Sequence, residues 1–151
     1  MTQTPKTARE GGQHIAVRVY YEDTDAAGIV YYANYLRFAE RGRTEFLRSY
    51  GFERTDIAHG VAFAVRNCTI DYLAPARLDD LLDVETQLMN LQGASLTVAQ
   101  TIRREGKELV RLTVRMACMD ADGNVARMPA ELRDALKTVA SQSPSKMRRS
   151  A

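Results

Sequence analysis

The chain has 151 residues, of which 45% are hydrophobic and 26% charged, and its net charge is +2. This length and apolar content predict one domain with a substantial core, and the nearly balanced charge gives little support for a protein that binds nucleic acid. No apolar run is long enough to span a membrane, and residues 1–12 lack the apolar stretch of a secretory signal. We therefore expect a cytoplasmic protein without membrane insertion.

The two ends of the chain differ in composition from its middle. Residues 1–12 and 141–151 are polar or basic, which predicts a disordered leader and a disordered basic tail around one domain at residues 13–140. Cys68 and Cys118 fall in alternating apolar runs, which predicts buried, reduced thiols. Neither belongs to a Cys-x-x-Cys pair, so we expect no zinc site.

The first predicted elements are a strand and a long helix. Alternating apolar side chains predict a strand over residues 15–21. After an aspartate-rich segment, a helix is expected from about Tyr31 to Tyr50, and Gly51 suits its C-terminal end. A glycine within the apolar face of this helix predicts close approach to a sheet. The apolar face comprises Tyr35, Phe38, Ala39, Gly42 and Phe46.

The rest of the chain reads as a meander of strands. Strands are predicted over residues 61–72, 82–88, 94–102 and 110–118, with a short helix over 129–139. The parity of the apolar positions switches at Arg66–Asn67, which predicts a β-bulge there. Gly93 and residues 105–107 predict hairpin turns. This order is typical of an α+β fold in which one helix covers one sheet face, so the other face or an edge calls for a second subunit.

The segment between the first strand and the helix contains two carboxylates and a glycine. Aspartate caps turns and helix starts, and this is the interpretation we favour for Asp23. For Asp25, which is nearer to the helix, both capping and catalysis stay open. A carboxylate beside a helix N-terminus faces N–H groups that can polarise a carbonyl. An EF-hand calcium loop is disfavoured, because Ala27 and Asn34 stand where ligands are required.

Other catalytic classes lack their signatures. There is no Gly-x-Ser-x-Gly elbow, phosphate-binding loop or dinucleotide fingerprint, and we expect neither a cofactor nor a metal. His14 and His59 are expected to be surface residues rather than catalytic bases. Arg103, Arg104 and Lys107 recur around one hairpin turn, where they form either a solvated face or a clamp for an anionic ligand.

Two runs carry a resemblance to a known family. The run "YYEDTDAAGIVYYANYLRFAERGRTEFL" resembles the active-site motif of the hotdog-fold acyl-CoA thioesterases, in both the 4-hydroxybenzoyl-CoA thioesterase group and the group linked to the Tol-Pal cell-envelope system. The run "VAFAVRNCTIDYLAPARLDDLLDVET" resembles the Tol-Pal-linked branch. The similarity covers about residues 15–137. It implies a hotdog fold, in which an antiparallel sheet wraps a long helix, and a homodimer or homotetramer with sites at the dimer interface.

The resemblance also implies roles for individual residues. The family's catalytic aspartate falls on Asp25, and the amide that polarises the thioester carbonyl falls near Tyr32. Gly28 and Glu40 match further positions of the motif, as does Asp23. The Tol-Pal-linked branch usually has histidine where this chain has Tyr32, so a mechanism through that histidine cannot operate here. The three basic residues of the hairpin are the candidates for binding the CoA phosphates.

The implied activity is hydrolysis of an acyl-CoA to a free acid and CoA. A thiol leaving group, with a pKa of about 8.5, needs no strong general acid. Asp25 can act as a nucleophile or as a base that activates water, and both roles stay open, as does the acyl group. A hotdog dehydratase would need a histidine near the helix, which this chain lacks. The alternative is a non-enzymatic acyl-CoA-binding or cell-envelope adaptor on the same scaffold, against which the intact Asp25–Gly28 motif argues.

Overall fold

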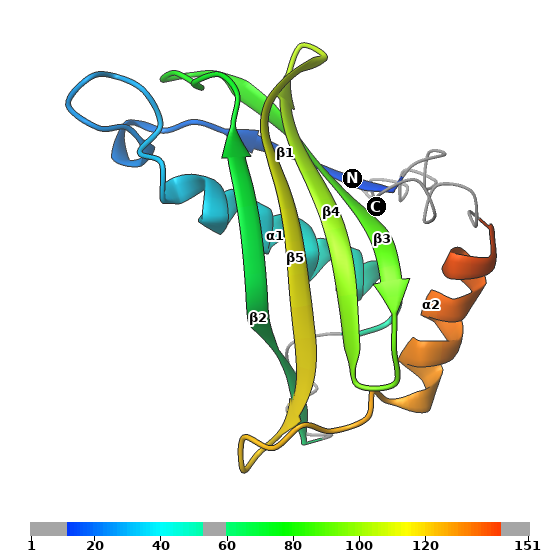
Figure 1. Cartoon of the computed structure of the whole chain (residues 1–151). Helices are drawn as coiled ribbons and strands as arrows, with labels where there is room; N and C mark the ends of the chain where they lie inside the picture. Colours follow the sequence, from blue (N-terminus) through cyan, green and yellow to red (C-terminus); the bar gives the residue numbers. More distant parts are fainter. Residues whose placement is uncertain (1–11, 53–59, 143–151) are drawn as a thin grey trace, which may run out of the picture.

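A computed structural model describes residues 12–52 and 60–142 of the chain. Within them, one antiparallel sheet of five strands has the order β1-β3-β4-β5-β2, and a long helix crosses behind it (Figure 1). His59 and nearly all of the predicted leader and tail lie outside the described residues. In chain order the elements are β1 (Gln13–Arg18), the short 3-10 helix η1 (Tyr21–Asp23), α1 (Asn34–Ser49), β2 (Val61–Tyr72), β3 (Leu81–Leu91), β4 (Ser95–Arg104), β5 (Lys107–Asp120) and α2 (Ala130–Gln142).

The turns and the bulge predicted from the sequence are confirmed. Hairpins join β3 to β4 and β4 to β5. In the second hairpin, Glu105 and Gly106 have φ angles of 50° and 82°, the pair of positive values that a tight hairpin turn requires. The register between β2 and β5 shifts between Val65 and Asn67, where the apolar parity switches.

Helix α1 covers the inner face of the sheet, mainly over β1, β3 and β4. It begins at Asn34, a few residues later than the sequence suggested. The close approach predicted at Gly42 is confirmed, since a Cβ there would lie 2.9 Å from Cγ1 of Val84 and 3.0 Å from Oγ1 of Thr86. The buried face of α1 comprises Tyr35, Phe38, Ala39, Gly42, Phe46 and Leu47.

A buried glutamine fastens α1 to the sheet at this point. The side-chain N–H₂ of Gln100, which is 1% exposed, donates to the carbonyl of Ala39 at 2.8 Å and to Oγ1 of Thr86 at 2.9 Å. Its Oε1 accepts a hydrogen bond from Arg43 at 3.0 Å. Buried polar groups destabilise a core unless they are paired, and these bonds satisfy both ends of the amide. They also set the position of α1 along the sheet.

The outer edge formed by β2 corrects one prediction. Cys118, on central strand β5, is buried as expected, but Cys68 on β2 is exposed. An alternating run indicates a strand without indicating its place in the sheet, and β2 lies at an edge that α1 covers less than it covers β1 and β3. Helix α2 packs against β3 and buries Leu132 and Leu136. Neither helix among the described residues combines the length and apolar character needed to cross a membrane.

Candidate active site

The aspartate-rich segment folds into a small, self-bonded loop before α1. Oδ2 of Asp23 accepts a hydrogen bond from the N–H of Tyr20 at 2.8 Å. The Asp23 carbonyl accepts two more, each at 2.9 Å, from the N–H of Tyr31 and the side chain of Asn34. Asp23 thus ties the start of the loop to its end, and the turn role expected for it is confirmed.

Asp25 lies in the tight turn at the tip of this loop. Thr24 and Val30 form an antiparallel bridge, and the Asp25 N–H donates to the Ile29 carbonyl at 2.8 Å. Gly28 closes the turn by donating to the Asp25 carbonyl at 3.0 Å, with a φ of 78° that favours glycine. Oδ1 of Asp25 accepts from the Ala27 N–H at 2.8 Å. One carboxylate oxygen is therefore held in place, and the side chain is half-buried.

The relation between Asp25 and α1 differs from the sequence expectation. We expected a carboxylate facing the helix N-terminus, but α1 begins only at Asn34 and the Asp25 carboxylate bonds within its own turn. The bridge between Ile29 and Arg77 joins the loop to the segment after β2 instead. Two intervening tyrosines, Tyr31 and Tyr32, lead from this turn to the helix.

Aromatic rings connect the loop to the end of β2. Tyr32 is 62% exposed, and its ring lies 4.9 Å from that of Tyr31 and 6.1 Å from that of Tyr72. The Tyr72 hydroxyl donates to the Tyr32 carbonyl at 3.0 Å, and desolvation raises the pKa of this hydroxyl above its ordinary value. Beneath them, the buried Tyr35 hydroxyl accepts from the Ala76 N–H at 3.0 Å. The backbone near Tyr32 is thus fastened to the C-terminal end of β2.

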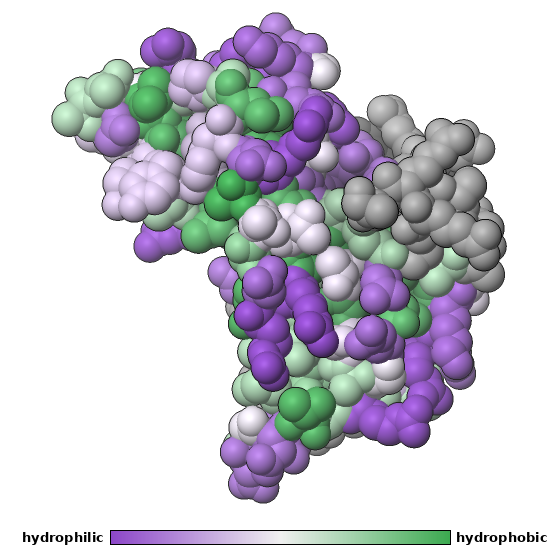
Figure 2. Space-filling model, in the orientation of Figure 1, coloured by the Kyte–Doolittle hydropathy of each residue, from purple (hydrophilic) through white to green (hydrophobic). Residues whose placement is uncertain are grey.

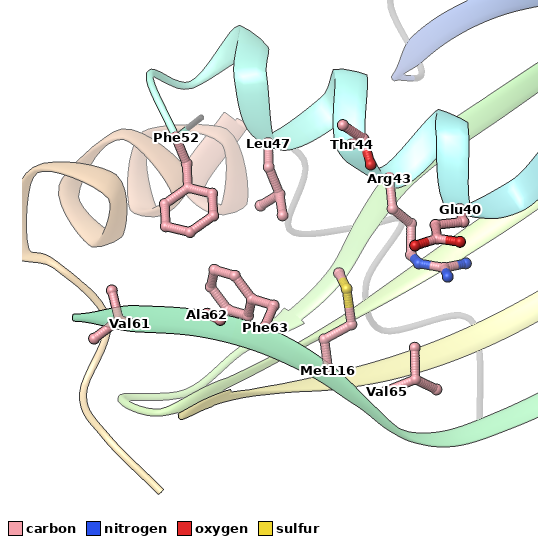
Figure 3. A pocket seen from close by; sticks show the side chains of 10 residues that line it. All are labelled: Glu40, Arg43, Thr44, Leu47, Phe52, Val61, Ala62, Phe63, Val65 and Met116. Atoms are coloured by element: carbon pink, nitrogen blue, oxygen red, sulfur yellow. The ribbon is translucent and has the colours of Figure 1, made fainter. Parts of the chain in front are cut away.

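A cavity of about 430 Å³ opens between the C-terminal half of α1 and the first half of β2 (Figure 3). Glu40, Arg43 and Thr44 of α1 supply its polar groups. The part lined by Phe52 and Phe63 is apolar, and these two rings meet edge-on with centroids 5.2 Å apart. Asp25 and Tyr32 are not among the residues that line it. The full lining is Glu40, Arg43, Thr44, Leu47, Phe52, Val61, Ala62, Phe63, Val65 and Met116.

Sequence reasoning identified Glu40 but missed the rest of this cavity. The apolar positions at the end of α1 and the start of β2 were visible as parts of two elements. The sequence contains no signal that these two segments face each other, because a long-range packing decides it. The spacing of these apolar positions is the same as that of residues that simply pack in a hydrophobic core.

The basic residues predicted to hold phosphates are already engaged. Arg103 forms ion pairs with Glu85 at 3.2 Å and Glu108 at 3.6 Å. Arg104 pairs with Asp80 at 2.7 Å, so the two guanidinium groups have separate partners. Lys107 is exposed at the hairpin turn. The structure therefore shows these arginines in structural ion pairs rather than converging as one clamp.

His14 is half-buried on β1, away from the catalytic candidates. Its Nδ1 lies 2.9 Å from Asp83 and its Nε2 lies 3.2 Å from Glu85. These neighbours are on β3, so the histidine bridges two strands of the sheet. Among the described residues, no cluster of histidine, cysteine and acidic side chains is suited to hold a metal ion.

The sequence and the fold match known proteins. The family model of the thioesterase-like superfamily matches residues 19–136. The acyl-CoA thioesterase YbgC of Haemophilus influenzae is 45% identical over 113 residues, which are 74% of this chain and 83% of the relative. The acyl-CoA thioester hydrolase YbgC of Escherichia coli O6:H1 is 48% identical over 106 residues, covering 69% of this chain and 79% of the relative.

Solved structures give the same result. A probable thioesterase from Bartonella henselae superposes with a TM-score of 0.75 at 40% identity, over 78% of this chain and 98% of that one. A gentisyl-coenzyme A thioesterase, at 24% identity and a TM-score of 0.75, shares the fold over 80% of this chain and 99% of its own. The chain belongs to the thioesterase-like superfamily and has its hotdog fold.

Proposed function

We propose that the protein is an acyl-CoA thioesterase that hydrolyses the thioester of an acyl-CoA to a free acid and CoA. The names of the two relatives described above support this activity. The observation that supports it in the structure is the Asp25 carboxylate, held by one oxygen in a tight turn of the loop before α1. We infer that this carboxylate works with the backbone N–H near Tyr32, a segment that the Tyr72 hydroxyl fastens to the end of β2. Hydrolysis of a thioester is accelerated by a carboxylate that attacks the carbonyl or activates water, together with an N–H that polarises the carbonyl.

Two routes suit this geometry. In the first, Asp25 attacks the thioester carbonyl and expels the CoA thiolate, and water then cleaves the resulting anhydride. In the second, Asp25 takes a proton from water, the oxygen of that water attacks the carbonyl, and the proton passes to the departing sulfur. In both routes the N–H near Tyr32 stabilises the negative charge that develops on the carbonyl oxygen.

We also propose that the working unit is a homodimer paired through β2. This strand forms an edge of the sheet, and Val65 and Tyr72 on it are 49% and 46% exposed. Figure 2 shows the molecule hollowed along this side, below the projecting loop that contains Asp25. An unpaired edge strand presents a row of N–H and C=O groups that a second copy can pair with.

Within one copy, Asp25 does not line the cavity. Antiparallel pairing of two β2 strands about a two-fold axis at their middle would bring the cavity of one copy to the Asp25 loop of the other. The start of β2 lines the cavity, while its end carries Tyr72, which contacts Tyr32. Two-fold symmetry places the start of one β2 beside the end of the other. The cavity of one copy thus faces the Asp25 loop of the second copy, and it can hold the acyl group with Glu40 at its polar side.

Other features of the family stay predictions for this chain. They are the assembly of two dimers into a homotetramer, the link to the Tol-Pal system, the cytoplasmic location, and a role for Lys107 at the CoA phosphates. The arginines Arg103 and Arg104 could reach a phosphate only by exchanging the carboxylate partners they now have.

The activity is tested by measuring release of free thiol from CoA thioesters with short-chain, long-chain and hydroxybenzoyl acyl groups. We expect wild type to cleave at least one of them. Asp25→Asn should lower kcat by about 100-fold or more, in the range that a positioned base or nucleophile contributes. Its thermal midpoint should stay near that of wild type. Equal turnover by the variant would remove Asp25 from the mechanism, and no turnover by folded wild type would contradict the activity.

The shared site is tested by mixing two inactive variants. Asp25→Asn removes the carboxylate, and Thr44→Trp fills the cavity from α1. If each site combines both copies, unfolding and refolding the mixture should restore about one quarter of wild-type turnover, because half of the mixed dimers are heterodimers with one intact site. Each variant refolded alone is the control. No recovery in a mixture shown by mass spectrometry to contain heterodimers would place the whole site within one copy.

A further inference from the structure

A second hollow, of about 530 Å³, lies between the β3–β4 hairpin and α2. In Figure 1, α2 is at the opposite side of the molecule from the Asp25 loop. The catalytic proposal uses none of its residues. Its lining comprises Asn90, Leu91, Gln92, Gly93, Arg127, Arg133, Lys137 and Ala140.

The charges in this hollow all have the same sign. Arg127, Arg133 and Lys137 contribute three cations, and no acidic residue of the described part of the chain lines it. The salt bridges found among residues 12–52 and 60–142 include none of the three. Cations repel one another when they converge, so such a site favours the entry of an anion.

The first cation is held on a fixed segment of backbone. The Arg127 carbonyl accepts a contact from the Cys118 thiol at 3.9 Å, and the next residue, Met128, donates its N–H to the Gly93 carbonyl at 3.1 Å. The Arg127 guanidinium lies over Gly93, with two nitrogens 3.7 Å from the position a Cβ would take there. The β3–β4 hairpin and the segment before α2 therefore both contribute to the position of the Arg127 guanidinium.

The other two cations lie one turn apart on α2. Leu132 and Leu136 form the neighbouring buried stripe of this helix, and Arg133 and Lys137 line the hollow beside it. Nε of Arg133 is buried and has no hydrogen-bond partner among the described residues. An unpaired buried donor costs free energy, and an anion that draws the guanidinium into the hollow would relieve that cost.

Neutral donors complete the lining. Oε1 of Gln92 accepts a hydrogen bond from the Ser95 hydroxyl at 3.1 Å, which leaves the amide N–H₂ as the donating end. Asn90 adds a second amide. Two guanidinium groups, one ammonium and amide donors match the charge and the several oxygens of a phosphate better than those of a carboxylate or a halide.

We propose that this hollow binds a phosphate monoester. Its volume admits a group larger than the phosphate itself, either a soluble nucleotide or the headgroup of a lipid such as phosphatidic acid. The site is independent of the thioesterase proposal, because it shares no residue with the Asp25 loop or with the cavity beside α1.

The test is a titration of the full chain with three probes. Inorganic phosphate and adenosine 3′,5′-bisphosphate are titrated by calorimetry, and vesicles of phosphatidylcholine with or without phosphatidic acid are tested by co-sedimentation. The variant Arg133→Gln/Lys137→Gln should bind the preferred probe about 10-fold or more weakly, since two charge-assisted contacts are lost. Arg111→Gln/Arg115→Gln removes the same charge from the exposed face of β5 and should bind like wild type.

The outcomes separate the sources and the alternatives. Binding of a soluble probe that the α2 double variant weakens and the β5 control does not indicates a nucleotide site in the hollow, and the same pattern with phosphatidic acid vesicles alone indicates a lipid headgroup site. Binding that the α2 double variant leaves unchanged belongs to another site and overturns the proposal. If the double variant is poorly folded, Arg127→Gln provides a second test, because Arg127 lies outside α2. This variant should also bind the preferred probe more weakly than wild type. Failure of wild type to bind any probe, or an equal loss in the β5 control, would overturn the proposal.

Discussion

At the scale of the residue, two glycines illustrate different constraints. Gly42 faces a crowded sheet, with atoms of Val84, Thr86 and Gln100 within 3.0 Å of a hypothetical Cβ. Gly28 has open space around it and is required by its φ of 78°. Substitution therefore acts through packing at the first position and through backbone strain at the second.

Gly42→Ala is expected to lower the free energy of unfolding by about 1–3 kcal/mol, because overpacking outweighs the gain in helix propensity. Urea unfolding measures the change. Gly93→Ala is the matched control, since its Cβ would meet only Arg127 at an ordinary 3.7 Å. A Gly42 variant as stable as wild type would show that the sheet and α1 can separate without cost.

Gly28→Ala is expected to lower kcat more than stability, because the strained turn displaces the Asp25 carboxylate. The free energy of unfolding should fall by about 1–2 kcal/mol, the cost of a left-handed residue with a Cβ. Gly123→Ala, at a φ of 82° with open space, should lose similar stability and keep its turnover. Thiol release and urea unfolding of both variants decide the matter, and equal kcat values would contradict the positioning role of the turn.

At the scale of the element, Asp80 joins the loop before β3 to the end of β4. Its Oδ2 accepts from the Arg77 N–H at 2.8 Å and from Arg104 at 2.7 Å. Burial alone would raise the pKa of this carboxyl, but the two hydrogen bonds and the arginine charges outweigh it and hold the pKa below its ordinary value. The ionised form is thus the one that stabilises the fold.

The stability of the protein should therefore depend on pH through Asp80. Because the folded-state pKa is lowered, the contribution is complete above the unfolded-state pKa of about 3.9 and is lost as the pH falls through the folded-state value. Asp80→Asn should flatten the fall in unfolding free energy below about pH 4. Urea unfolding of both proteins from neutral to acidic pH measures this, and parallel curves would contradict it.

At the scale of the whole molecule, the proposed dimer depends on the free edge of β2. In an edge strand, successive N–H groups point alternately to the neighbour and outward, so proline at one of two adjacent positions spares the pairing with β5. Cys68→Pro and Thr69→Pro test both positions. We expect one variant to stay folded by circular dichroism but to sediment as a monomer without turnover. A folded, active dimer in that variant would show that β2 is not the interface.

Much of the fold was predictable because its signals are local. The apolar face of α1, the bulge near Asn67 and the hairpin turn at Gly106 all follow from spacing and from backbone preferences within a few residues. The turn role of Asp23 was predictable for the same reason. Asp25 as the catalytic candidate came from the motif, whose pattern is continuous in the sequence.

Only the tertiary structure decided which distant side chains meet. Cys68 is exposed because β2 lies at a sheet edge, and Arg104 pairs with Asp80 because β4 ends beside the loop before β3. The cavity beside α1 and the cationic hollow beside α2 each join segments far apart in the chain. Periodicity determines which face of an element is buried, but the order of strands and the placement of helices determine what that face contacts.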